Sequence, residues 1–99
     1  MVIDTLKSKV VEYYKAKDME RLGVLRFYLS VVQNKEIELK PEGKKVDDEV
    51  AFAVLKKQIK QRNQSIELYE KGGRKDLVEK EQSELVVLKE FAKLFPFEL

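Results

Sequence analysis

Apolar residues recur along the chain every three or four positions, and charged residues occupy most of the positions between them. This spacing is typical of amphipathic helices. Runs of β-branched residues are short, and only two prolines occur, Pro41 and Pro96. The pattern therefore predicts an all-α protein. We expect four helices, over about residues 2–17, 19–39, 48–71 and 75–95.

The second predicted helix has the widest apolar surface. One stripe holds Leu22, Leu25, Leu29 and Val32, and a second stripe that includes Tyr28 lies beside it. An apolar arc of this width is typical of a helix that packs against neighbours on two sides. We therefore expect the helix over residues 19–39 to lie at the centre of the fold.

Short polar residues and glycines mark the ends of these helices. Asp18 and Asp47 precede apolar-periodic stretches and are expected to cap the free N–H groups of the helices that follow. Pro41 and Gly43 lie in a polar loop over residues 40–45. Gly72-Gly73 ends the third helix, and the fourth starts soon afterwards. The last two helices are therefore predicted to form a long antiparallel hairpin.

Two charged residues, Arg62 and Glu81, interrupt the apolar stripes of this hairpin. A turn at Gly72-Gly73 pairs residues whose numbers sum to about 145, which brings Arg62 within one helical turn of Glu81 and Glu84. A partly buried arginine needs a carboxylate partner. We predict an ion pair across the hairpin, which Arg26 could join. A structural role that fixes the register is favoured over a catalytic carboxylate, because no nucleophile or second acid converges there.

Length and composition exclude much chemistry. The 99 residues suit one domain, residues 1–99, and 20 basic residues against 18 acidic ones give a net charge of +2. The chain has no Cys and no His, which excludes thiolate zinc sites, disulfides and imidazole catalysis. Its glycines match neither common nucleotide-binding fingerprint. We expect no cofactor, no metal and no enzymatic activity.

No segment is typical of a membrane protein or of a signal peptide. The best apolar stretch, Phe27 to Val32, covers six residues and includes Ser30, whereas a spanning helix needs about 20. Charged residues lie close to the N-terminus, where a signal peptide would be apolar. These features predict a cytoplasmic protein.

One stretch of the third helix is biased in charge. Lys56, Lys57, Lys60 and Arg62 fall within residues 56–66, which contain no acidic residue. Lys56 and Lys60 share one exposed side with two amide residues, Asn63 and Gln64. Lysines neutralise phosphates and amides hydrogen-bond nucleic acids, so the stretch is a candidate RNA contact, with a plain solvated face as the alternative. The candidate RNA-contacting residues are Lys56, Lys57, Lys60, Arg74 and Lys75.

The C-terminus is unusually apolar for a chain end. Phe91, Phe95, Phe97 and Leu99 lie within nine residues, whereas terminal segments are usually polar and frayed. Either these side chains fold back on the helices, or they cover a protein partner or a second copy of the chain.

Several spaced motifs resemble the YqeY-like family, and they cover about residues 2 to 91. The matching stretches are Lys17-Asp18-x-x-Arg21-Leu22-x-x-Leu25-Arg26, Asn34-Lys35-Glu36-Ile37-Glu38, Lys60-Gln61-Arg62-x-x-Ser65-Ile66-Glu67 and Gly73-Arg74-x-Asp76-Leu77-x-x-x-Glu81-x-x-Glu84-Leu85-x-x-Leu88. The four motifs occur in the family's order, which makes the resemblance specific.

The resemblance implies an all-helical domain shared with the C-terminal region of GatB, the B subunit of the glutamine-dependent aminoacyl-tRNA amidotransferase. That region contacts tRNA, and the family often carries the label of carbon–nitrogen ligase activity with glutamine as amido donor. The family usually continues into a smaller three-helix subdomain, which we expect to be absent here. The implied function is a non-catalytic, tRNA-contacting helical adaptor. The alternative is a protein–protein interaction module, or a self-associating one, without an RNA role.

Overall fold

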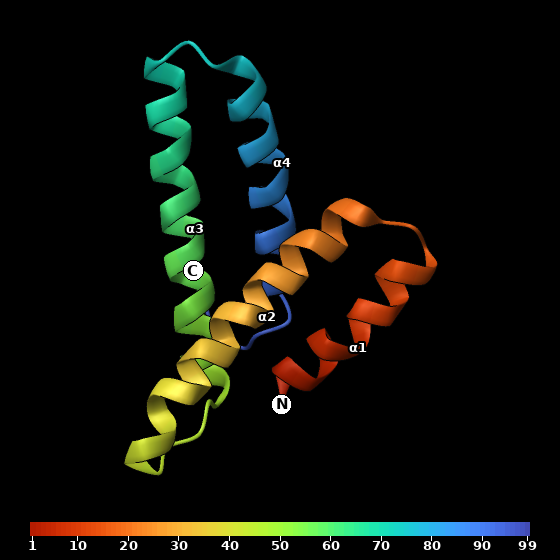
Figure 1. Cartoon of the computed structure of the whole chain (residues 1–99), viewed down its shortest axis with the longest axis vertical. Coiled ribbons are helices and arrows are strands. Elements are labelled where there is room, and N and C mark those ends of the chain that lie inside the picture. The colour runs from red at the N-terminus through yellow and green to blue at the C-terminus, as the bar shows by residue number, and fades with distance from the viewer.

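The computed structural model describes all residues from 1 to 99 and is all-α, as predicted. Figure 1 shows the four helices and their order along the chain. They are α1 (Val2–Lys15), α2 (Met19–Leu39), α3 (Asp48–Lys71) and α4 (Lys75–Ala92), with a 3₁₀ turn at Lys40–Glu42 between α2 and α3. None of these helices has both the length and the apolar character needed to cross a membrane.

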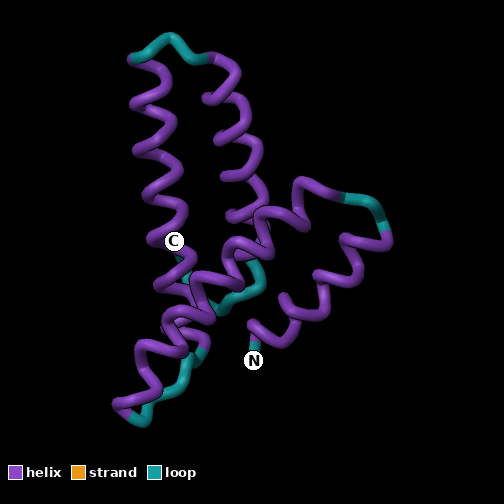
Figure 2. Tube along the Cα trace, viewed as in Figure 1, coloured by secondary structure: helices purple, strands orange, loops and turns teal.

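The helices form two antiparallel pairs. α3 and α4 make the predicted hairpin, and α2 crosses its base with α1 lying along the other side of α2 (Figures 1 and 2). The tip of the hairpin extends away from α1 and α2, and the molecule measures 46 × 32 × 23 Å along its principal axes. The central position predicted for α2 is confirmed, because α2 lies between α1 and the hairpin of α3 and α4 and contacts all three helices (Figure 1).

Two of the predicted helix starts are confirmed at the level of single hydrogen bonds. The carboxylate of Asp18 accepts from the backbone N–H of Arg21 at 3.1 Å, and that of Asp47 accepts from Val50 at 2.9 Å. Each aspartate thus satisfies an N–H group that the first helical turn leaves free.

Two predicted helix ends were wrong by two or three residues. α1 ends at Lys15 because Lys17 adopts a left-handed conformation, with φ of 57°, and the N–H of Asp18 then bonds back to Tyr13. Gly73, with φ of 69°, ends α3 in the same way, and in this case the glycine had predicted the end of the helix. α4 ends at Ala92 and not at Phe95, because residues 93–95 continue as tighter turns.

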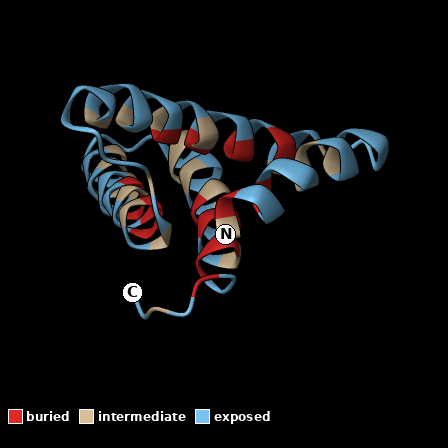
Figure 3. Ribbon diagram, turned by 90° about the horizontal axis from the view of Figure 1, so that it is seen from below, coloured by how far each residue is buried: buried red, intermediate tan, exposed pale blue.

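The core lies where α2 crosses the hairpin. Figure 3 shows buried residues gathered at the crossings and exposed residues over the outer faces. Tyr28 of α2 is fully buried, and its hydroxyl donates to the carbonyl oxygen of Ala51 in α3 at 2.6 Å. Leu25 and Leu55 are fully buried beside it in the same cluster. This packing holds α2 against the start of α3.

The apolar C-terminus folds back on the helices. Phe91 and Phe95 are buried, and the ring centroids of Phe95 and Phe97 each lie 5.3 Å from that of Phe52 in α3. Of the four residues considered as a partner surface, only Leu99 remains exposed. The other three side chains are therefore engaged within the chain itself, because folding back buries their apolar surface.

Candidate functional site

The predicted basic stretch forms an exposed face on α3. Lys56, Lys60, Asn63 and Gln64 border one shallow depression, whose lining also includes Glu67 and the C-terminal Leu99. Neither lysine makes an ion pair with a carboxylate of the chain. Their charges are consequently available to an external anion. We call these four residues the basic face.

The five candidate RNA-contacting residues do not form a single patch. Lys57 lies on the border of a different depression, which faces α2. Arg74 and Lys75 lie at the tip of the hairpin, and Arg74 is paired with Asp76 at 3.2 Å. Hydrogen bonding to the Arg74 guanidinium lowers the pKa of Asp76. The structure thus separates the basic face, Lys57 and the hairpin tip.

The structure brings Arg62, Glu81 and Glu84 together across the hairpin. Arg62 Nη1 lies 2.9 Å from Glu81 Oε2 and 2.6 Å from Glu84 Oε2. All three side chains are mostly buried, with 16–17% exposed. One guanidinium nitrogen therefore holds two carboxylates that would otherwise repel each other.

The suggestion that Arg26 joins this cluster was wrong. Arg26 is exposed, makes no ion pair, and lines a depression between α1 and α2 with Asp4 and Glu36. Each residue turns an α-helix by about 100°, so Arg26 lies to one side of Gly23 and Phe27, which face the hairpin.

A wide groove lies beside the Arg62 cluster. A depression of about 750 Å³ is bordered by the first half of α2 and the middle of α3 and α4, and a second of about 550 Å³ continues it toward the start of α3. The two meet at Phe27, Gln58 and Gln61. We call the combined groove the α2–α3 trough. Its defining residues are Gly23, Phe27, Val31, Val54, Gln58 and Arg62.

Gln58 is the polar residue on the floor of the trough, and sequence reasoning missed it. Its side chain is only 5% exposed, and neither the amide nitrogen nor the amide oxygen has a hydrogen-bond partner. Glutamine in a lysine-rich helix reads as a solvated residue, so no signal in the sequence singled it out. Only the crossing of α2 over α3 buries it.

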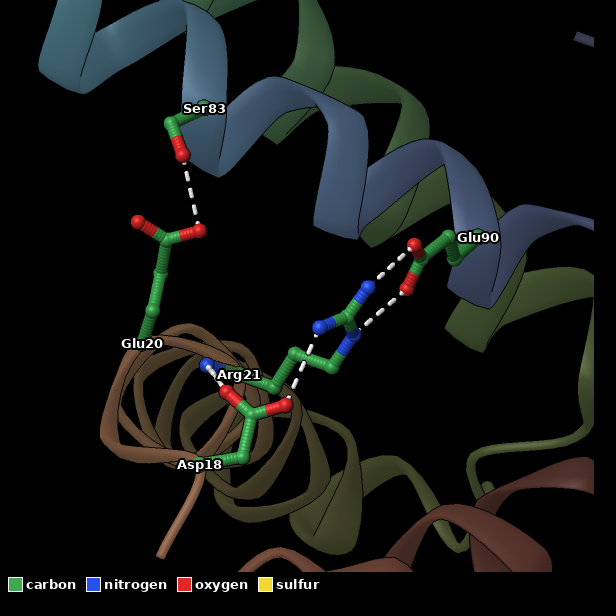
Figure 4. Close-up of polar contacts among 5 residues, drawn as sticks. All are labelled: Asp18, Glu20, Arg21, Ser83 and Glu90. Atoms are coloured by element: carbon green, nitrogen blue, oxygen red, sulfur yellow. Dashed lines mark hydrogen bonds and ion pairs between the residues drawn. The ribbon is translucent and has the colours of Figure 1, made fainter.

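A second arginine cluster was also missed. Arg21 donates to both carboxylate oxygens of Glu90, from Nε at 2.9 Å and from Nη2 at 2.7 Å, and its Nη1 donates to Asp18 at 3.0 Å (Figure 4). Nearby, the hydroxyl of Ser83 donates to Glu20 at 2.7 Å, again joining α4 to α2. Asp18 and Arg21 stood within a motif of the family resemblance, but Glu90 lies 69 positions beyond Arg21.

These contacts shift the acid titration of the two carboxylates. Hydrogen bonds from the backbone and side chain of Arg21 lower the pKa of Asp18 below its usual value. Hydrogen bonds from the Arg21 guanidinium likewise lower the pKa of Glu90. Both groups therefore stay charged to more acidic pH in the folded chain, and the bridge between α2 and α4 persists with them.

The residues around the trough offer hydrogen bonds, charge and apolar contact. No group of three acidic side chains is arranged to hold a metal ion. The unpaired amide of Gln58, the exposed ring of Phe27 and the Arg62 cluster are features of a binding surface.

Comparisons with known proteins agree with the sequence resemblance. The model of the family described as Yqey-like protein matches residues 3–95. Three similar relatives are each named altered inheritance of mitochondria protein 41, mitochondrial, and come from Kluyveromyces lactis, Lachancea thermotolerans and Saccharomyces cerevisiae. They are 38%, 36% and 35% identical to this chain over 94 residues, which is 95% of the chain. The chain spans about half the length of these relatives, 49–50%.

These relatives contradict the expected cytoplasmic location, because their names describe them as mitochondrial. The expectation failed for a physical reason. Charge and hydropathy show that a folded domain suits an aqueous compartment, but they do not distinguish one such compartment from another. The fold, by contrast, follows from the residues themselves, and the family model covers nearly all of them. The chain belongs to the YqeY-like family.

Proposed function

We propose that this chain is a non-catalytic helical adaptor that contacts RNA through the basic face of α3, with tRNA as the favoured class. The observation that carries the proposal is the basic face itself. Lys56 and Lys60 are exposed and unpaired, and residues 50–66 contain no acidic residue.

The geometry of α3 supports a backbone contact. The acid-free segment covers 17 residues, which is about 25 Å of straight helix at 1.5 Å per residue. Asn63 and Gln64 stand beside the two lysines and can hydrogen-bond phosphate or sugar oxygens. Arg74 and Lys75 provide a second cationic point at the hairpin tip. Contacts of this kind position a nucleic acid without reading its sequence.

Family membership supports the same proposal. The YqeY-like family resembles the tRNA-contacting helical region of GatB, and the amidotransferase chemistry itself belongs to other parts of that enzyme. The chain spans about half of its curated relatives, so the RNA contact is proposed for this domain and the ligase label is not carried over. No nucleophile or nucleotide-binding fingerprint accompanies the basic face.

The test is a titration of fluorescently labelled bulk tRNA with the chain, followed by anisotropy at about 50 and 200 mM salt. We expect micromolar binding that weakens with salt, because cations released from the phosphates drive it. The double variant Lys56→Glu/Lys60→Glu is expected to lose binding at both salt concentrations.

The matched control is Lys7→Glu/Lys15→Glu, which makes the same change in net charge on α1. It should retain most of the binding. Absence of binding at low salt, or equal losses in both double variants, contradicts the proposal. In the first case the domain has no RNA contact, and in the second the attraction is a general effect of net charge.

A further inference from the structure

The residue on the floor of the α2–α3 trough, Gln58, lowers the stability of the isolated chain. Gln58 is only 5% exposed, yet its side-chain amide makes no hydrogen bond. Burying an amide without partners is unfavourable, because it gives up hydrogen bonds to water and gains none. Gln58 lines both depressions of the trough, and its two amide atoms are covered. Rotation of the side chain would let a ligand in the trough supply both a donor and an acceptor.

Gly23 provides a second, independent observation on the opposite wall. It lies inside α2, where glycine weakens a helix relative to alanine. A Cβ atom added at Gly23 would meet no atom of the chain within 4 Å. The chain's own packing therefore does not require a glycine here. A glycine in such a position allows another molecule to approach the helix backbone closely.

The trough has the shape and lining of a helix-binding groove. Its α3 wall extends from Val50 to Ser65, which corresponds to about 22 Å, or four turns of helix. Phe27, which is 55% exposed, stands in the middle, with Val31 and Val54 on the same side. An exposed aromatic between aliphatic residues is typical of surfaces that receive the apolar face of an amphipathic helix.

Charge along the trough is unequal. At the end near α4, three carboxylates, Glu20, Glu81 and Glu84, outnumber the two cations Arg62 and Lys80. At the other end, two lysines, Lys35 and Lys57, outnumber the single carboxylate of Glu38. A polyanion is therefore a poor match for the end near α4. A helix with basic residues at one end and acidic residues at the other matches both ends.

We infer that the α2–α3 trough binds an amphipathic helix of a protein partner. The apolar face of that helix packs on Phe27, Val31 and Val54, and its backbone passes close to Gly23. A polar side chain of the helix hydrogen-bonds the amide of Gln58, and its basic end lies over Glu81 and Glu84.

This interface is separate from the basic face. Lys56 and Lys60 are each two positions from Gln58, which turns them about 160–200° around the helix axis. RNA and the partner helix would therefore occupy opposite sides of α3. The inference goes beyond the proposed RNA contact and does not require it.

The test uses a displayed library of amphipathic helical peptides of about 16 residues, or ~24 Å, with apolar positions fixed at helical spacing and the ends randomised among Lys, Arg, Glu and Gln. Peptides are selected on the wild-type chain and counter-selected on Gly23→Leu, in which the new side chain fills the trough. The selected peptides are then titrated into the ¹⁵N-labelled chain, and the side-chain amide signals of Gln58 report contact directly.

We expect enriched peptides with a basic end, which shift the Gln58 signals and bind at least about tenfold more weakly to Gly23→Leu and Gln58→Leu. Gly23→Ala adds only one methyl group and should weaken binding less than Gly23→Leu. Gln64→Leu is the matched control, because it makes the same change about 120° around α3, outside the trough, and it should bind as the wild type does. Near-wild-type helical content of each variant excludes loss of folding as the cause.

Four outcomes overturn the inference. The first is that no peptide is enriched on the wild-type chain relative to Gly23→Leu, and the second is that the selected peptides leave the Gln58 signals unmoved. The third is that tRNA moves those signals. The fourth is that the signals move when the protein alone is diluted, which would indicate that a second copy of the chain occupies the trough. The RNA proposal fails separately. Lys56→Glu/Lys60→Glu should keep peptide binding, and Gln58→Leu should keep RNA binding.

Discussion

Two arginines join α4 to the rest of the chain, and their surroundings differ. Arg21 uses three nitrogens on two carboxylates, so that Glu90 is held at both oxygens and Asp18 at one. Arg62 uses the single nitrogen Nη1 on both Glu81 and Glu84, and its Nε and Nη2 make no hydrogen bond within the chain. The side chains of the first cluster are 29–38% exposed, whereas those of the second are only 16–17% exposed.

The difference separates a structural contact from a candidate binding surface. The Arg21 cluster is complete, because its guanidinium is matched by carboxylate oxygens in good geometry and nothing beside it lacks a partner. The Arg62 cluster borders the trough, where Gln58 lacks partners altogether. Local cost to stability of this kind is common where a surface serves binding.

The largest effect is expected from Arg62→Met. Removing the guanidinium leaves two mostly buried carboxylates facing each other, which should lower the free energy of unfolding by about 3 kcal/mol. Denaturant unfolding followed by circular dichroism measures the change. The triple variant Arg62→Met/Glu81→Gln/Glu84→Gln should recover most of the loss. A loss below about 1 kcal/mol in the single variant would mean that the Arg62 cluster contributes no more to stability than an exposed salt bridge does.

The next effect has the opposite sign. Gln58→Leu replaces an unpaired buried amide by an apolar side chain of similar size, and should raise the free energy of unfolding by about 1 kcal/mol. The same denaturant titration measures it, with the exposed Gln64→Leu as the control for a change in helix propensity. Destabilisation by Gln58→Leu would mean that the amide does find partners in the isolated chain.

Arg21→Met should destabilise the chain less than Arg62→Met does. Its side chain and that of Glu90 are 37–38% exposed, so water replaces much of what the ion pair provides. The backbone N–H of residue 21 remains, so Asp18 continues to cap α2. The two midpoints of thermal unfolding, measured together, test this order. A larger fall for Arg21→Met would reverse the contrast between the clusters.

The smallest effect is a dependence on pH. The pKa values of Asp18 and Glu90 are lower in the folded chain than their usual values of 3.8 and 4.5. Their contribution to stability is therefore full above those usual values and is lost as pH falls through the lowered ones. The urea midpoint should fall between about pH 5 and pH 3, and part of that fall should disappear in Arg21→Met. Equal falls of the urea midpoint in the wild type and in Arg21→Met would mean that these carboxylates do not contribute to acid unfolding.

Prediction from sequence succeeded where the determinants lie close together along the chain. Asp18 and Asp47 cap helices through residues three positions away. Gly73 ends α3 with a left-handed conformation that glycine adopts readily. The contact of Arg62 with Glu81 and Glu84 followed from a short turn, which fixes the register of the two helices.

Prediction failed where a contact depended on how distant helices cross. The end of α1 is a separate, local failure, because Lys17 adopts a left-handed conformation that residues other than glycine rarely adopt. The 100° turn per residue already separates Lys57 from the side that Lys56 and Lys60 share, but only the position of α2 decides that Lys57 borders the trough. The apolar periodicity of α3 does not indicate which of its glutamines a crossing helix will bury.

The sequence by itself determined the four helices, their caps, the hairpin and the family, because apolar spacing and local hydrogen bonds act within a few residues of each other. Only the tertiary structure decided that Arg21 bonds Glu90 across 69 positions, that the C-terminal phenylalanines pack on Phe52, and that Gln58 lies unpaired under α2. The reason is physical. Packing between helices depends on which faces meet and at what angle, and many pairings satisfy the same apolar stripes.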